Sequence, residues 1–278
     1  MKQNLDKNTV DGFGEEWAKF DQSELNNDEY DQLFMNYFRS FPFEKLPKEA
    51  IGADIGCGSG RWAKQVANKV GKLYCVDASI EALNTAKKNL KEFDNIEFLN
   101  QSVDSIDIED NSLDFLYSLG VLHHIPDTFD GIKSCAKKIK NNGYFLIYLY
   151  YNLDNRPFYF RLIWKISELG RNFISRLPAK LKFFLTDIIA LIVYFPIAKL
   201  SKLLENIGFN VDKIPLSFYR NTSFYTMRTD ALDRFGTRLE QRFSKIEIEN
   251  MLIKAGFKDI VFNDKEPFWV AVGRKCVE

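Results

Sequence analysis

Histidine and cysteine are scarce in this 278-residue sequence, and neither charge is in excess. The four cysteines, at positions 57, 75, 135 and 276, form no Cys-x-x-Cys pair, so we expect no metal site and interpret them as reduced thiols of a cytoplasmic protein. The 38 basic and 38 acidic residues cancel, which argues against a nucleic-acid-binding protein, because such proteins carry a basic excess. No internal repeat is present, and residues 1–7 are too polar for a signal peptide.

The sequence does have a glycine-rich turn, Ala53-Asp-Ile-Gly-Cys-Gly-Ser-Gly60, between an apolar extended run and a helical run. A second predicted strand, residues 72–77, ends on Asp77. Glycine lets a backbone turn tightly and approach a ligand where a Cβ would collide. A strand, a glycine turn, a helix and a strand with a terminal acid together indicate a nucleoside site, in which the acid accepts the ribose hydroxyls.

The spacing of this turn is Gly-x-Gly-x-Gly rather than the dinucleotide pattern Gly-x-Gly-x-x-Gly. With Asp54 two residues ahead and Asp77 seventeen residues beyond Gly60, it resembles the class I S-adenosylmethionine-dependent methyltransferases, in particular the type 11-like members. The resemblance covers residues 50–150 and 243–274. It implies an α/β fold with a doubly wound, seven-stranded, mostly parallel sheet, and S-adenosylmethionine as the cofactor.

By this resemblance, the glycine backbone lies under the methionyl part of the cofactor, Asp54 organises the turn and the ammonium end, and Asp77 binds the ribose. The family commonly has Gly-Asp-Ala after its third strand, but here Ser102 stands where that acid is expected, and Asp104 is its substitute two residues later. The expected cofactor contacts are Asp54, Gly56, Cys57, Gly58, Gly60, Asp77, Ala78, Ser102, Val103, Asp104, Ser118 and Leu119.

The only two histidines are adjacent, in a segment that looks like the loop beyond the family's fourth strand. A neutral imidazole can take a proton from a substrate hydroxyl or amine, so His123 and His124 are the candidate catalytic bases, with His123 placed first. The alternative is that one of them packs or caps this loop.

Alternating patterns predict strands at 51–55, 72–77, 95–99, 113–118, 143–150, 258–263 and 268–273, with helices at 60–69, 79–92, 128–140 and 243–257. Ser79 and Ser244 are expected helix N-caps, Glu247 completes a capping box, and residues 141–143 are a predicted turn. We expect N-terminal helices (1–45) that pack on the domain or form a lid over the cofactor, a cofactor-binding core (46–151 and 236–278) and a helical insert (152–235).

The first half of the insert is apolar and basic. Leu162, Ile166, Leu169, Phe173 and Leu177 form one helical stripe, and residues 152–207 hold nine Lys or Arg against four Asp or Glu, a net +5. The apolar run 183–198 is shorter than the roughly 20 residues that span a bilayer, so we do not expect a membrane span. The alternatives are a cap that buries its apolar face on the domain or in a homo-oligomer, and an amphipathic segment, 155–205, that contacts membrane peripherally.

The second half of the insert interleaves aromatic, arginine and aspartate residues. Arginine forks bind carboxylate or phosphate, so Arg220, Tyr225, Arg228 and Asp230 are candidate substrate contacts for an anionic acceptor. The sequence predicts an S-adenosylmethionine-dependent methyltransferase acting on a hydroxyl or amine of a small-molecule, sugar or lipid-linked acceptor. The alternatives are a methyltransferase of an apolar quinone-like acceptor and a non-catalytic cofactor-binding partner subunit.

Overall fold

The computed structural model describes residues 3–277, so residues 1–2 of the expected N-terminal segment lie outside the described residues. The chain divides into two compact units. The sheet unit comprises residues 3–22, 32–151 and 239–277, and the helical unit comprises residues 23–31 and 152–238. Each unit is described by itself.

The sheet unit is built on one seven-stranded sheet in the order β3-β2-β1-β4-β5-β7-β6. Only β7 runs antiparallel, to β5 on one side and β6 on the other. The strands are β1 (Ile51–Ile55), β2 (Lys72–Asp77), β3 (Ile96–Asn100), β4 (Leu113–Leu119), β5 (Ile139–Tyr148), β6 (Phe257–Phe262) and β7 (Val270–Lys275). The predicted α/β class and the mostly parallel seven-stranded sheet are confirmed.

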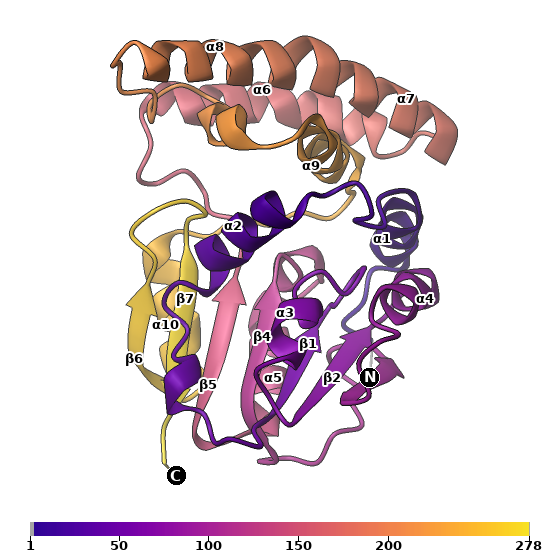
Figure 1. The fold of residues 1–278 in the computed structure, drawn as a ribbon, viewed down its shortest axis with the longest axis vertical. Coiled ribbons are helices and arrows are strands. Elements are labelled where there is room, and N and C mark those ends of the chain that lie inside the picture. The colour runs from indigo at the N-terminus through magenta and orange to yellow at the C-terminus, as the bar shows by residue number, and fades with distance from the viewer. Residues whose placement is uncertain (1–2, 278) are drawn as a thin grey trace. The chain divides into compact units, whose positions relative to one another are not determined.

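Helices flank this sheet on both faces, with α3 in front and α5 behind in Figure 1. They are α1 (Lys7–Lys19), α2 (Asn27–Phe38, which begins in the helical unit), α3 (Ala63–Ala67), α4 (Ile80–Asn89), α5 (Thr128–Lys138) and α10 (Lys245–Lys254), with the short 3-10 turns η1 (Phe43–Lys45) and η2 (Leu122–His124). The predicted caps are confirmed. Ser79 accepts the Ala82 N–H at the start of α4, and Ser244 with Glu247 forms a capping box at α10.

Two boundary predictions are wrong. The helix expected at 60–69 is only five residues long, because the glycine loop continues to Gly60 with positive φ angles before α3 begins. The turn expected at 141–143 is part of β5, which begins at Ile139. The β4–β5 register shifts between Leu113 and Phe115, and Asn142 has φ 65°, so this segment is an irregularity inside the strand.

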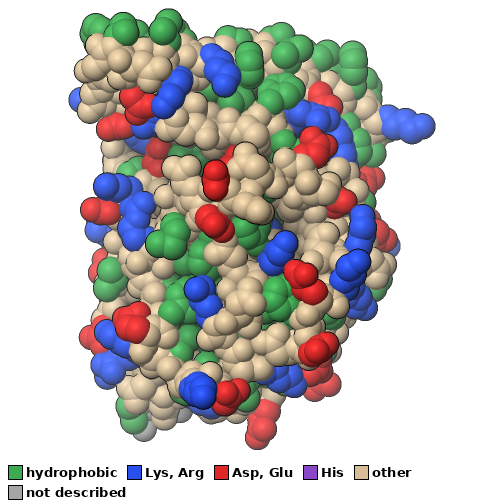
Figure 2. Space-filling model, in the orientation of Figure 1, with side chains coloured by type: hydrophobic (Ala, Val, Ile, Leu, Met, Phe, Trp, Pro, Cys, Tyr) green, Lys and Arg blue, Asp and Glu red, His purple; other side chains and the backbone are tan. Residues whose placement is uncertain are grey.

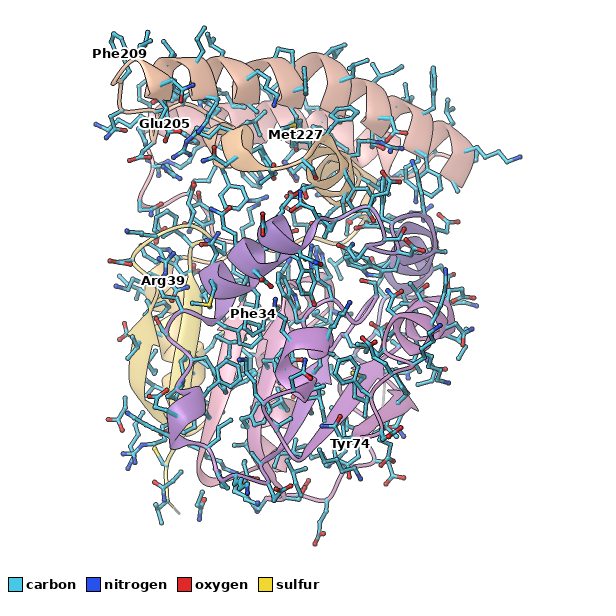
Figure 3. The ribbon with its side chains drawn as sticks, in the orientation of Figure 1. Phe34, Arg39, Tyr74, Glu205, Phe209 and Met227 are labelled. Atoms are coloured by element: carbon cyan, nitrogen blue, oxygen red, sulfur yellow. The ribbon has the colours of Figure 1, made fainter. Side chains whose placement is uncertain are left out.

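The helical unit contains α6 (Phe158–Ile174), α7 (Ala179–Ile189), the π-helical segment η3 (Ala190–Tyr194), α8 (Phe195–Asn206), the 3-10 turn η4 (Ser217–Asn221) and α9 (Phe224–Gly236). Its small core is formed where η3 and α8 meet α9, and it includes Met227, labelled in Figure 3. Glu29 from the start of α2 accepts the Ser223 N–H and the Thr226 hydroxyl, so this short segment anchors the beginning of α9.

The prediction about the apolar run also needs correction. α7, η3 and α8 form one helix, Ala179–Asn206, of 28 residues with a mean hydropathy of 1.9 in its most apolar window. By length and composition it is long enough to cross a bilayer, which takes roughly 20 residues, so the expectation that the run is too short is wrong. Only 28% of that window is buried, whereas the core helix of a globular protein is mostly buried.

The pairing of β1 with β4 leaves no room for a side chain at Gly52, which can be tested by substitution. A Cβ at Gly52 would overlap the ring of Phe115, its partner in the sheet register and a fully buried side chain. We expect Gly52→Ala to destabilise the protein by about 1–3 kcal/mol in urea unfolding. The matched control is Gly170→Ala within α6, where the new Cβ meets only Phe235 at 3.5 Å. There the higher helix propensity of alanine should stabilise by up to about 1 kcal/mol. Equal effects of the two substitutions would contradict this packing.

Candidate active site

The glycine loop after β1 lies against the end of β2. The backbone N–H groups of Gly56 and Cys57 both donate to the Val76 carbonyl, and the Gly60 N–H closes a tight turn onto Cys57. Gly56 has φ 76°, and a Cβ there would overlap Val121. The loop therefore requires glycine for its conformation and for its close approach to neighbouring segments.

Asp77 holds this loop in place. Its Oδ2 accepts the Gly58 N–H at 2.9 Å and its Oδ1 accepts the Ser79 N–H at 2.8 Å. Burial raises the pKa of Asp77, and these two hydrogen bonds oppose the rise. A carboxylate has about four acceptor sites, so each oxygen can accept a further donor such as a ribose hydroxyl.

Asp54 lies at the end of β1, 1% exposed. Burial raises its pKa to about 8, and the negative charge of Asp77 adds to this. The Tyr117 hydroxyl acts in the opposite direction, although Asp54 Oδ2 has no hydrogen-bond partner of normal geometry among residues 3–277. The buried Ser59 hydroxyl also lacks such a partner within the described chain. Buried polar groups are nearly always paired in native proteins, so these two atoms leave hydrogen-bonding capacity at the carboxyl end of β1.

The residues after β3 come to the same edge of the sheet. Asn100 donates to the carbonyls of Asp77 and Ala78, which joins the ends of β3 and β2. The Ser102 hydroxyl donates to Asp104. Burial alone would raise the pKa of Asp104, but the Ser102 hydroxyl and the Asn4 N–H outweigh it and lower the pKa.

Ser118 and Leu119 close β4 at this edge too, where the Ser118 hydroxyl donates to the Ile55 carbonyl. The structure thus brings the twelve predicted cofactor residues to the carboxyl ends of β1 to β4, where ligands bind in open α/β sheets.

The N-terminal segment covers this edge. Trp17 of α1 lies against the loop, because a Cβ at Gly58 would come within 2.8 Å of its indole nitrogen. Nearer the N-terminus of α1, the Phe13 ring is 4.9 Å from the His124 ring. Asn4 donates to the Asp127 carbonyl and accepts the Asp127 N–H. The helical spacing of Phe13 and Trp17 indicates a packed face, but nothing in the sequence identifies Asn4 as a contact.

The two histidines lie on η2, both buried. Burial lowers the pKa of His123 well below its usual value, so its ring is neutral. Its Nδ1 accepts the Tyr150 N–H at 3.4 Å, which places the ring proton on Nε2. His124 has the opposite tautomer, because its Nδ1 is 2.7 Å from the Leu239 carbonyl and must donate to it. His124 Nε2 therefore carries the lone pair that a base needs.

The four predicted substrate residues lie in the helical unit. Arg228 makes two hydrogen bonds of 3.0 Å to Asp187, and Arg220 binds Glu205, labelled in Figure 3, at 2.9 Å. Tyr225 is buried in α9, and Asp230 is half-buried on the same helix. Both arginines thus have carboxylate partners within their own unit, which accounts for them without a substrate.

A seven-stranded sheet of this order, with the glycine loop and Asp77 at the carboxyl ends of β1 and β2, defines the class I methyltransferase fold. Comparison with known proteins agrees. Residues 53–147 match the family described as methyltransferase domain. The chain is 29% identical over 118 residues to a ubiquinone biosynthesis O-methyltransferase of Nitrosomonas europaea, across 42% of this chain and 49% of that protein.

Two further proteins extend the comparison. Phosphoethanolamine N-methyltransferase 2 of Caenorhabditis elegans is 34% identical over 100 residues, across 35% of this chain and 23% of that protein. The solved structure of a possible histamine N-methyltransferase from Thermotoga maritima has a TM-score of 0.50 and 14% identity, over 95% of this chain and 99% of that one. The chain thus spans less than half the length of either curated relative.

Residues 53–147 therefore match the methyltransferase domain family, and the chain has the class I methyltransferase fold, which implies S-adenosylmethionine as the cofactor. The residues present fit that cofactor. Asp77 can accept ribose hydroxyls, and the buried Asp54 carboxyl, with one oxygen unpaired among the described residues, suits the cationic ammonium end. Among residues 3–277, no cluster of three or more His, Cys, Asp or Glu is arranged to hold a metal ion.

The pKa of Asp54 makes cofactor binding dependent on pH. In the free protein the carboxyl is protonated below about pH 8. A cationic ammonium group beside it favours the ionised form, so binding releases a proton, and affinity should rise by up to about tenfold per pH unit between pH 6 and pH 8. Calorimetry with S-adenosylhomocysteine in two buffers of different ionisation heat measures the proton release directly. Asp54→Asn should flatten the profile, whereas a wild-type affinity that stays constant or falls with pH would contradict this assignment.

The ion pair between Arg228 and Asp187 leads to a prediction about stability. Because both side chains are about a quarter to a third exposed (26% and 33%), Arg228→Ala should cost about 1 kcal/mol of stability. Asp187→Ala should cost about the same, and the double variant should cost less than the sum of the two. The double-mutant cycle is measured by urea unfolding, with calorimetry of S-adenosylhomocysteine as the control that should not change. Additive losses would show that the pair is not coupled.

Proposed function

We propose that this chain transfers a methyl group from S-adenosylmethionine to an oxygen or nitrogen atom of a small-molecule, sugar or lipid-linked acceptor. The observation that supports this most is the loop geometry, in which the Asp77 carboxylate binds the Gly58 N–H and the Ser79 N–H beside the buried Asp54 carboxyl. The four cysteines are free, three of them buried, which supports a cytoplasmic location.

Bound S-adenosylmethionine supplies a methyl group on a positively charged sulfur. Charge is lost rather than created at that centre, so the protein contributes mainly alignment and the exclusion of water. Trp17 and Phe13 of α1 supply apolar cover at the edge of the sheet.

His124 is the better candidate for the base that takes the acceptor's proton, because the Leu239 carbonyl holds its Nδ1 proton and leaves the lone pair on Nε2. The neutral His123 lies beside it and adds no positive charge, with its ring centre 3.9 Å from that of His124.

The acceptor has two candidate classes. The relatives' names include both an O-methyltransferase of ubiquinone biosynthesis and an N-methyltransferase of phosphoethanolamine, so they support methyl transfer but do not select the acceptor atom. A quinone-like acceptor is the second candidate. The apolar, exposed helix Ala179–Asn206 favours it, since an apolar acceptor is found in or beside membranes.

The experiment measures binding and transfer separately. We expect S-adenosylhomocysteine to bind the wild type and Asp77→Asn to weaken binding about 10- to 100-fold, because hydrogen bonds to a charged carboxylate are lost. Asp107→Asn, an exposed carboxylate on the loop after β3, is the matched control and should bind normally. Transfer of tritiated methyl is then assayed on a soluble hydroquinone, phosphoethanolamine and a hydroxyl-rich sugar. Binding without transfer to any acceptor, in this panel or in a broader one, would favour the non-catalytic subunit, and absence of binding would refute the proposal.

A further inference from the structure

The exposed residues of α6, α7, η3 and α8 belong to only a few chemical types. Between residues 158 and 206, all of which the structure describes, every exposed residue is hydrophobic, basic, asparagine or proline, and none is acidic. The basic ones are Arg161, Lys165, Arg176, Lys180 and Lys199. A helix that meets only water usually exposes polar residues of both charges.

Helix α6 presents its apolar stripe outward. Leu162, Ile166, Leu169 and Phe173 are 53–73% exposed, although their spacing is that of a helix face which would normally be buried. Arg161 and Lys165 are exposed one position before Leu162 and Ile166. The stripe is therefore not buried within the helical unit.

The helix Ala179–Asn206 repeats this arrangement. Its exposed large apolar residues run along its whole length, and Figure 2 shows hydrophobic side chains gathered over α7 and α8. They are Leu181, Phe184, Leu191, Ile192, Val193, Phe195, Leu200 and Leu203. The opposite side of this helix packs on α9, where Lys182, Thr186 and Tyr194 are buried. A helix with one side packed on a neighbouring helix in this way is placed to lie along an apolar layer rather than to cross it.

The three acids of these helices are paired with arginines. Glu168 binds both Arg171 and Arg234. Burial alone would raise the pKa of Glu168, but the two guanidinium groups outweigh it and lower the pKa to about 2. Asp187 is paired with Arg228 and Glu205 with Arg220. The exposed cations Arg161, Lys165, Arg176 and Lys180, by contrast, have no ion-pair partner among residues 3–277.

We propose that the outward faces of α6 and of Ala179–Asn206 dock on an anionic lipid bilayer, with the apolar side chains in the interface and the unpaired cations on the lipid head groups. The charge pattern selects this partner, because an apolar face with unpaired cations complements a surface that is apolar beneath and negative above. A two-fold dimer through the same faces would set like cations against each other. This proposal does not rest on the methyltransferase activity.

Flotation of the purified full-length protein tests the proposal, with vesicles of neutral phosphatidylcholine alone or with 30% phosphatidylglycerol as the probe. We expect flotation with the anionic vesicles, weakened by added salt because head-group attraction is screened. Arg161→Glu with Lys165→Glu should reduce binding at least about tenfold, since each cation near an anionic surface contributes a several-fold gain. Ile166→Asp with Leu169→Asp should abolish it.

The matched control is Ile246→Asp, which replaces an equally exposed apolar residue (68%) near the start of α10 in the sheet unit and should float like the wild type. All three variants change exposed side chains, and unchanged binding of S-adenosylhomocysteine would show that they fold. Equal flotation with neutral vesicles, or none at all, would overturn the proposal. A salt-resistant, carbonate-resistant association would indicate a spanning helix instead. A dimer in sedimentation that Ile166→Asp with Leu169→Asp dissociates, without flotation, would assign the surface to a second copy of the chain.

Discussion

The carboxylate of Asp77 is the interaction on which the candidate site depends. One oxygen holds the Gly58 N–H and the other holds the Ser79 N–H, so a single side chain joins the glycine loop after β1 to the start of α4. The loop in turn provides the surface on which Trp17 lies. The same carboxylate adds to the raised pKa of Asp54. Loss of this carboxylate would therefore affect the position of the glycine loop, the packing of Trp17 on that loop and the pKa of Asp54.

Features that a few neighbouring residues determine were predictable from the sequence. The glycine spacing and the acid at the end of β2 reflect backbone requirements within one strand-turn-helix-strand unit, and the structure brings them together as the spacing indicates. The capping box at Ser244 and Glu247 is equally local, since each residue satisfies the other's backbone N–H. The mostly parallel sheet, though not the order of its strands, follows from the alternation of strands and helices.

Features that depend on a distant partner were not predictable. Arg228 and Asp187 are 41 residues apart and meet only because α9 packs on α7, so the sequence showed an arginine but not its partner. The histidine tautomers depend on the Tyr150 N–H and the Leu239 carbonyl, which are backbone groups and leave no signature in the sequence. The apolar run 183–198 was wrongly judged too short, because the helix continues on both sides, to Ala179 and to Asn206, through residues that are not all apolar. Asp187 and Pro196 lie inside this helix without ending it. One is held by an ion pair and the other lies at the start of α8.

The charge distribution of the helical unit has one physical explanation that covers both its inner and outer faces. An acid on the outer faces would repel an anionic surface, whereas an acid turned inward must be paired, because an unpaired buried charge costs several kcal/mol. Glu168, the least exposed of the three, is paired with two arginines, and the more exposed Asp187 and Glu205 are paired with one each. Arg161 and Lys165, by contrast, are exposed on α6 and have no carboxylate partner among residues 3–277. A helical cap that contacted only water would gain nothing from separating its charges in this way.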